Sequence, residues 1–171
     1  MTQVNLNITF RDTVNAADPE TIEELTTSCN IFYPEEIAVA RELVEDRLLK
    51  GISCGYYFFF AEVDGRIAGY TCFGPIPMTR SRFDIYWIAV FKAFQGTGIG
   101  RLLMQKTEDQ VQAMNGRRIY VETSSRNEYS PAHRFYSASG YHPDAVLKDY
   151  YAPGDSKLVY LKILTEDTCD I

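Results

Sequence analysis

Residues 85–104 read IYWIAVFKAFQGTGIGRLLM and combine three signals in one short stretch. The run from Ile85 to Val90 is apolar, aromatic and β-branched, which is typical of a buried strand. A turn follows that contains Gly96, Gly98 and Gly100, and the pattern after it predicts a helix over about 98–114. Such a turn directs backbone N–H groups and the positive end of the helix dipole toward one point. We therefore expect a phosphate or pyrophosphate site here.

A plain loop is the alternative for any glycine-rich turn, so the specific motifs have to be compared letter by letter. The P-loop pattern ends in Gly-Lys-Ser/Thr, whereas Gly100 is followed by Arg101. The Rossmann pattern is Gly-x-Gly-x-x-Gly, and here the third glycine comes one residue early. Both of these nucleotide-binding motifs are disfavoured.

The stretch resembles instead the acetyl-CoA-binding signature of the GNAT superfamily of acyl-CoA N-acyltransferases. That signature, Gln/Arg-x-x-Gly-x-Gly/Ala between a strand and a helix, is matched by Gln95, Gly98 and Gly100. The resemblance implies that acetyl-CoA is the co-substrate and that the anion is the pyrophosphate of coenzyme A. The cofactor-binding residues that it implies are Ile88, Ala89, Val90, Gln95, Gly96, Thr97, Gly98, Ile99, Gly100, Arg101, Asn127 and Tyr136.

The remaining pattern predicts an alternation of strands and helices along the chain. Strands are expected at 4–10, 56–62, 67–73, 82–90, 118–124, 141–147 and 157–164, and helices at 18–29, 34–50, 98–114 and 130–140. Asp18 and Ser130 are the expected N-caps. This order is similar to that of the GNAT fold, an α/β, three-layer α/β/α arrangement with a mixed, mostly antiparallel central sheet. We expect one domain over residues 1–164 and a C-terminal tail over 165–171.

Composition and charge narrow the function classes. The net charge of −6 argues against nucleic acid as a partner. No apolar run approaches the ~18 residues of a membrane span, and the N-terminus lacks the form of a signal peptide, so we expect a cytoplasmic protein without a membrane partner. The four cysteines and two histidines are scattered, which predicts no metal site and reduced thiols in or near the core.

The acidic charge is concentrated in residues 18–50, which hold nine acidic and three basic side chains, a balance of 3 − 9 = −6. Solvated helix faces would account for this concentration. The alternative is an electrostatic field that favours a cationic acceptor.

Residues 131–141, PAHRFYSASGY, resemble a second GNAT segment. The resemblance implies that Tyr136 lies near the coenzyme A sulfur and acts as general acid on the leaving thiolate. The alternative is that Tyr136 only packs the helix or only positions the cofactor. The family's pantetheine-contacting Asn corresponds to Tyr129 here, and the nearest Asn is Asn127, so which of the two contacts the pantetheine arm is open. An alkylammonium must lose a proton before it attacks, and Asp84 and Glu122 are the candidate bases. Each could instead be a strand carboxylate held in an ion pair.

The resulting hypothesis is an acetyl-CoA-dependent N-acetyltransferase that acts directly on an amine of a small molecule or a protein. The alternative is a non-catalytic acyl-CoA-binding regulatory module, and a third reading is an interaction domain without a cofactor. The tyrosines and phenylalanines at 56–60 and 141–151 fit either the core or the interface of a homodimer.

Overall fold

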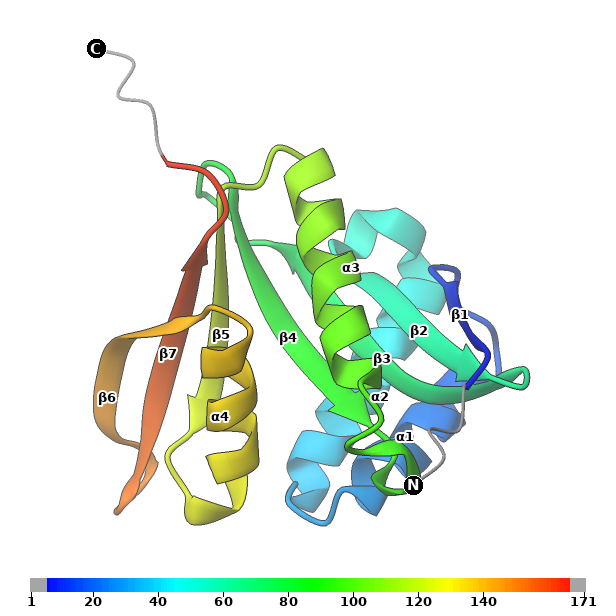
Figure 1. Ribbon diagram of the computed structural model, residues 1–171, viewed down its shortest axis with the longest axis horizontal. Helices are drawn as coiled ribbons and strands as arrows, with labels where there is room; N and C mark the ends of the chain where they lie inside the picture. The colour runs from blue at the N-terminus through cyan, green and yellow to red at the C-terminus, as the bar shows by residue number, and fades with distance from the viewer. Residues whose placement is uncertain (1–5, 167–171) are drawn as a thin grey trace. The chain divides into compact units, whose positions relative to one another are not determined.

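The computed structural model describes residues 6–166, which form the helices and strands labelled in Figure 1. The α-helices are α1 (Asp18–Ser28), α2 (Pro34–Lys50), α3 (Ile99–Ala113) and α4 (Ser130–Ala138). The strands are β1 (Ile8–Arg11), β2 (Tyr57–Val63), β3 (Arg66–Pro75), β4 (Arg82–Val90), β5 (Arg118–Ser124), β6 (His142–Ala152) and β7 (Asp155–Ile163). Short 3-10 turns lie at Gly51–Cys54, Lys92–Phe94 and Asn127–Tyr129.

The strands form one sheet in the order β1-β2-β3-β4-β5-β7-β6. The β4–β5 pair is parallel, while the β1–β2, β5–β7 and β6–β7 pairs are antiparallel. The predicted α/β class with a mixed, mostly antiparallel sheet is therefore confirmed.

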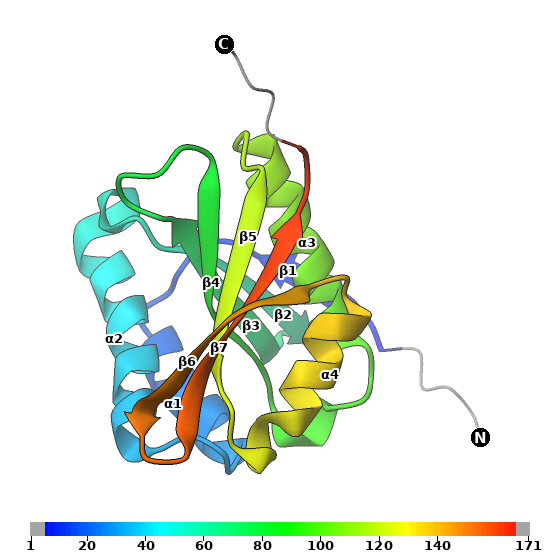
Figure 2. The same cartoon turned by 90° about the vertical axis from the view of Figure 1, so that its left-hand side faces the viewer.

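The described residues divide into two compact units, residues 6–72 with 87–106 and residues 73–86 with 107–166. In the first unit, α1 and α2 pack against each other, as Figure 2 shows. Ile22 and Leu25 of α1 and Val44 of α2 are fully buried in a cluster with strand residues. A second cluster joins Ile99 and Leu103 of α3 to apolar side chains of β2 and β3. These clusters hold both ends of the glycine-rich turn in place.

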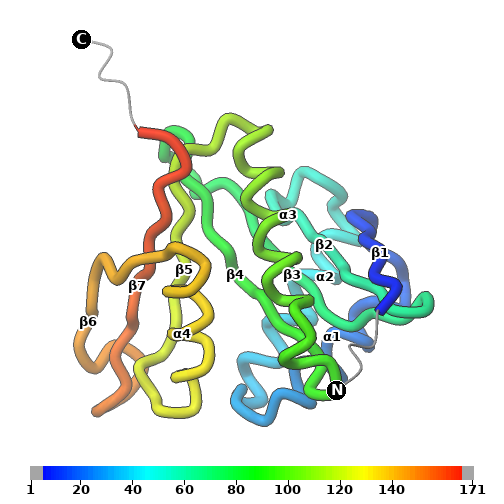
Figure 3. Tube along the Cα trace, viewed as in Figure 1, coloured from blue at the N-terminus to red at the C-terminus, as the bar shows by residue number. Residues whose placement is uncertain are grey.

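In the second unit, β5 lies between β4 and β7, and the long β6–β7 hairpin follows it, which is easily traced in Figure 3. The hairpin corrects the sequence prediction. We expected the strand to end at Leu147, but β6 continues to Ala152, and the turn is reduced to Pro153 and Gly154. Gly154 has φ +84°, a conformation that suits a tight hairpin turn. Cross-strand pairing, which lies outside any local pattern, extends the strand.

Both predicted N-caps were wrong. The cap of α1 is Ala17, and Asp18 is already helical because its carboxylate is held elsewhere. It accepts hydrogen bonds from the backbone N–H of Asn15 (2.7 Å) and from the Arg11 guanidinium (2.8 and 3.0 Å). The cap of α4 is Tyr129, because the preceding 3-10 turn leads straight into the helix.

The predicted first strand over 4–10 is observed as Ile8–Arg11, and its residues 4 and 5 lie outside the described residues. Residues 167–171 of the predicted tail also lie outside them. The single-domain prediction for residues 1–164 stays a prediction.

A substitution at Gly116, in the turn before β5, tests how tightly the second unit is packed. A Cβ at this buried glycine would clash with Val111 Cγ1 of α3 and lie 2.8 Å from the Phe83 ring of β4. We expect Gly116→Ala to lower the free energy of unfolding by about 1–3 kcal/mol through overpacking, measured by urea denaturation. In a Val111→Ala background, which removes the closest clashing atom, the same change should cost less. Equal costs in both backgrounds would show that this contact is not the cause.

Candidate functional site

The glycine-rich turn has an open backbone. Gly96 and Gly98 have φ values of +79° and +91°, and a Cβ added to either would have no atom within 4 Å. The helical hydrogen bonds begin with the N–H of Leu102 donating to the carbonyl of Gly98 at 3.2 Å. The N–H groups of a first helical turn lack partners within their helix, so those of Ile99, Gly100 and Arg101 can bind an anion. The turn forms an open cradle that side chains at these positions would fill, and its free N–H groups suit an anion.

Side chains and backbone brace this cradle from the inside. The Gln95 amide donates to the Val90 carbonyl at 3.2 Å, and the Thr97 hydroxyl donates to the Phe94 carbonyl at 2.6 Å. At the end of α1, the Ser28 hydroxyl accepts from the backbone N–H of Lys92 at 3.2 Å. The polar group of Gln95 is therefore used to hold the turn on the end of β4.

The other predicted cofactor residues near the turn differ in how far their side chains are buried. Ala89 and Ile99 are buried, and Ile88 and Val90 pack against the core cluster around Ile99. The side chains of Ile88 and Val90 remain half-buried, so both their backbone and part of their side chains are accessible. Arg101 is exposed on the first turn of α3.

The structure brings the two predicted bases, Asp84 and Glu122, together. Asp84 on β4 lies opposite Tyr120 in the parallel ladder, and Glu122 follows two residues later on the same face of β5. The pKa of Asp84 is raised to about 6, chiefly by burial and to a smaller extent by the charge of Glu122, while the charge of Lys157 opposes the rise. Asp84 is thus a stronger base than an ordinary carboxylate and is still mostly ionised above pH 7.

Lys157, on β7, is a member of this group that the sequence analysis did not identify. Its ammonium lies 2.6 Å from Glu122 Oε2 and 4.0 Å from the centre of the Tyr150 ring. It pairs in register with Ser124, two residues beyond Glu122 on β5. Only the strand register brings these residues together, so no local sequence signal could have identified Lys157.

Tyr136 lies on α4 in an aromatic cluster and is 8% exposed. Its ring centre lies 5.6 Å from that of Tyr160 and 6.4 Å from that of Tyr141. Burial, with a smaller contribution from Tyr160, raises the pKa of the Tyr136 hydroxyl well above its usual value. The hydroxyl therefore stays protonated at neutral pH and can act as a proton donor.

A model of the acetyltransferase (GNAT) family matches residues 20–141, well over half of the chain. The chain belongs to the GNAT family. This confirms the resemblance inferred from the glycine-rich turn.

Individual relatives agree with this membership. The chain is 31% identical over 108 residues to an N-alpha-acetyltransferase of Sulfurisphaera tokodaii, a match that covers 57% of this chain and 64% of that protein. The chain thus spans less than two thirds of that curated relative.

Solved structures show the same fold. A GNAT-family structure from Desulfovibrio desulfuricans has a TM-score of 0.90 at 40% identity, covering 92% of this chain and 99% of that one. The structure of yncA from Salmonella typhimurium, solved with acetyl-CoA, has a TM-score of 0.73 at 20% identity and covers 96% of this chain and 98% of that one.

Within this GNAT chain, the segment after β5 separates the two candidates for pantetheine contact. Asn127 is exposed, whereas Tyr129 is buried and lies under the Arg126 guanidinium at 5.1 Å from its ring centre. The exposed amide of Asn127 is the more accessible of the two groups. Contact with a cofactor stays a prediction for either residue.

The predicted site residues of this GNAT chain fall into both compact units. The turn and the end of β4 belong to the first unit, while Asp84, Glu122, Asn127 and Tyr136 belong to the second. Their catalytic and cofactor-binding roles stay predictions.

Residues 6–166 hold no cluster of three His, Cys, Asp or Glu side chains suited to a metal ion. None of the helices in this range has the length and apolar character that crossing a membrane requires. Cys29 and Cys72 are buried and Cys54 is half-buried, while Cys169 lies outside the described residues.

The raised pKa of Asp84 predicts a pH-dependent effect on stability. A carboxyl whose pKa is higher in the folded state stabilises the fold at low pH, and this stabilisation is lost as the pH rises through about 6. Relative to wild type, Asp84→Asn should therefore gain on the order of 1 kcal/mol in free energy of unfolding between pH 4 and pH 8, since solvent screens part of the effect. Urea denaturation at both pH values measures the change. Asp144→Asn, on the exposed strand β6, is the matched control, and an equal gain there would contradict the assignment to Asp84.

Proposed function

We propose that this chain transfers the acetyl group of acetyl-CoA directly to an amine of a small molecule or a protein. The observation that supports this best is the open cradle at Gly96 and Gly98, which precedes the first turn of α3 in a chain of the GNAT family. The yncA structure, solved with acetyl-CoA, shares this fold.

The cradle is proposed to hold the pyrophosphate through the backbone N–H groups of residues 95–101, aided by the Arg101 side chain. Acetyl-CoA, when bound, supplies an activated thioester. The backbone of Ile88–Val90 is proposed to donate a hydrogen bond to the thioester carbonyl, where negative charge develops during transfer. Asn127 is proposed to contact the pantetheine arm.

The carboxylate pair is proposed to provide the base. An alkylammonium has a pKa of about 10, so it must give up a proton before its nitrogen can attack. Asp84, with its pKa raised to about 6, is ionised at neutral pH and binds a proton more tightly than an unperturbed carboxylate. Proton transfer to Asp84 or Glu122, directly or through water, would free the amine.

Tyr136 is proposed to provide the acid. Its hydroxyl, like that of an ordinary tyrosine, is protonated at neutral pH, and burial, which raises its pKa, keeps it in that form. Donation to the leaving thiolate would prevent its return to the acetylated amine.

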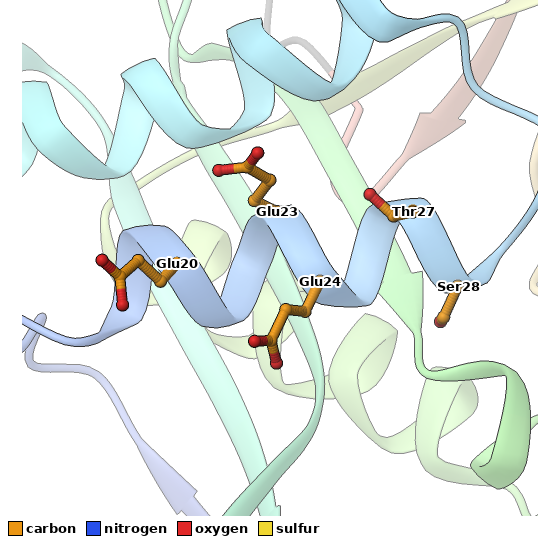
Figure 4. Close-up of a pocket in the computed structure, with 5 residues that line it drawn as sticks. All are labelled: Glu20, Glu23, Glu24, Thr27 and Ser28. Atoms are coloured by element: carbon orange, nitrogen blue, oxygen red, sulfur yellow. The ribbon is translucent and has the colours of Figure 1, made fainter.

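A cationic acceptor is favoured by the surface of α1. Glu20, Glu23, Glu24, Thr27 and Ser28 line a hollow in the first unit (Figure 4). Glu23 is paired with Arg41 at 2.5 Å, but the hollow as a whole is acidic. Its potential should attract polyamines or lysine-like amines more than neutral amines.

Calorimetric titration with acetyl-CoA tests the cofactor. We expect micromolar binding by the wild type and at least a tenfold loss in Gly98→Glu, because the new carboxylate would occupy the cradle and repel the pyrophosphate. Gly65→Glu is the matched control, since Gly65 also has positive φ (+73°) and open space at its Cβ. Absence of wild-type binding by the folded protein would contradict the proposal.

An amine panel with detection of free thiol then tests turnover. Binding without thiol release from any amine would point to the non-catalytic acyl-CoA-binding module instead. Turnover of neutral amines alone would contradict the cationic acceptor.

Tyr136→Phe tests the acid. Loss of the hydroxyl should lower kcat by roughly 10–100-fold, while the Kd for acetyl-CoA changes less than threefold. Steady-state kinetics with calorimetry separates the two quantities. Tyr160→Phe, which changes the neighbouring ring of the same cluster, is the control, and equal losses in both variants would indicate a packing role for Tyr136.

A further inference from the structure

Three charged side chains converge on one face of three neighbouring strands in the second unit. Asp84 lies opposite Tyr120, and Glu122 is two residues beyond Tyr120 on β5. Lys157 of β7 lies opposite Ser124, two residues beyond Glu122. Because side chains alternate along a strand, all three belong to the same face of the sheet.

Lys157 is held from two sides rather than lying loose on the surface. Its ammonium is 2.6 Å from Glu122 Oε2 and 4.0 Å from the centre of the Tyr150 ring. The Lys157 side chain is only 12% exposed, whereas that of Glu122 is 49% exposed. A fixed ammonium against both a carboxylate and an aromatic ring is more than an ordinary surface ion pair.

The charges of Asp84, Glu122 and Lys157 indicate how the Lys157 ammonium affects the two carboxylates. The negative charge of one carboxylate disfavours ionisation of its neighbour, and the charge of Glu122 adds to burial in raising the pKa of Asp84. Lys157 contacts Glu122 directly and compensates its charge. Asp84 is partly desolvated, so Asp84 is the carboxylate of the pair on which a proton is favoured.

The other charged groups around the three residues leave this balance intact. Burial is the main cause that raises the pKa of Tyr151 on β6, which keeps its hydroxyl neutral. Asp155 accepts a hydrogen bond from Ser124 at 2.5 Å and lies 3.6 Å from Arg126 Nε, so its charge is compensated. Burial lowers the pKa of Lys157, but the hydrogen bonds of its ammonium to Glu122 and Tyr150 outweigh burial, so the pKa is raised.

We propose that Lys157 is a positioning residue that holds Glu122 in an ion pair and thereby leaves Asp84 as the carboxylate of the pair that carries the exchangeable proton. The role of Asp84 as a base rests on the proposed acetyl transfer. The placement of the proton on Asp84 does not rest on acetyl transfer, because it is a property of the three side chains and can be measured without turnover.

The first experiment is a carbon-13 NMR titration of the side-chain carboxyls in wild type and Lys157→Met. Removing the ammonium leaves two carboxylates without a counter-charge, so the midpoint of the Asp84 titration should rise by about one pH unit. An unchanged Asp84 midpoint in the folded variant would overturn the proposal.

The second experiment is the pH profile of kcat/KM in the same variants. The acidic limb of the profile should shift to higher pH together with the Asp84 midpoint. For a shift of one pH unit, kcat/KM should fall roughly threefold at pH 6.5 and change little at pH 9. A purely structural role for Lys157 would lower the rate equally at every pH, and that result would also overturn the proposal.

Two variants serve as controls. Lys157→Arg keeps a permanent cation on β7 and should restore both the titration midpoint and the acidic limb toward their wild-type values. Lys148→Met removes one positive charge from the same hairpin at an exposed position and should leave both unchanged. A shift in Lys148→Met as large as that in Lys157→Met would mean that only net charge matters, which contradicts the proposal.

The two measurements also separate this inference from the proposed function. If no amine is acetylated but the Asp84 midpoint moves in Lys157→Met, the placement of the proton holds and acetyl transfer fails. If turnover occurs but neither the midpoint nor the limb moves, acetyl transfer stands and the role of Lys157 is wrong.

Discussion

The parallel ladder between β4 and β5 is the constraint on which the chemistry of the second unit depends. It covers only Arg82–Ile85 and Arg118–Val121, yet it fixes Asp84 opposite Tyr120 and therefore close to Glu122. A shift of one residue would turn one of the carboxylates to the opposite face of the sheet. The antiparallel β5–β7 ladder adds Lys157 by the same rule. Backbone hydrogen bonds thus set the distances between the ionisable groups, and those distances set their protonation.

The glycine-rich turn depends on a different constraint, which is local. Gly96 and Gly98 adopt positive φ, and this lets the backbone turn from β4 into α3 without side chains over the N–H groups. Gln95 and Thr97 use their polar groups to hold carbonyls of the same segment. The turn is therefore braced from within, and its outer side is left for a ligand.

The contrast between these constraints explains what the sequence could predict. The turn, the helices and most strands follow local patterns, and their prediction held. The N-caps at Asp18 and Ser130 were wrong because an ion pair with Arg11 and a preceding 3-10 turn outweighed local preference. The extension of β6 to Ala152 and the place of Lys157 beside Glu122 depend on strand register, for which a single sequence carries no signal. Asp84 and Glu122 were identifiable as candidates, but their proximity was not.

Burial raises the pKa of both Asp84 and Tyr136, but the consequences for the two groups differ. Removing either group from water disfavours its anion and raises its pKa. For Asp84 the rise stops near 6, so the carboxylate is still ionised at neutral pH and gains affinity for a proton. Tyr136 would be protonated at neutral pH even without burial, and the raised pKa makes its hydroxyl a weaker acid. Burial therefore strengthens Asp84 as a base but does not strengthen Tyr136 as an acid, and the charge of Lys157 opposes the rise at Asp84.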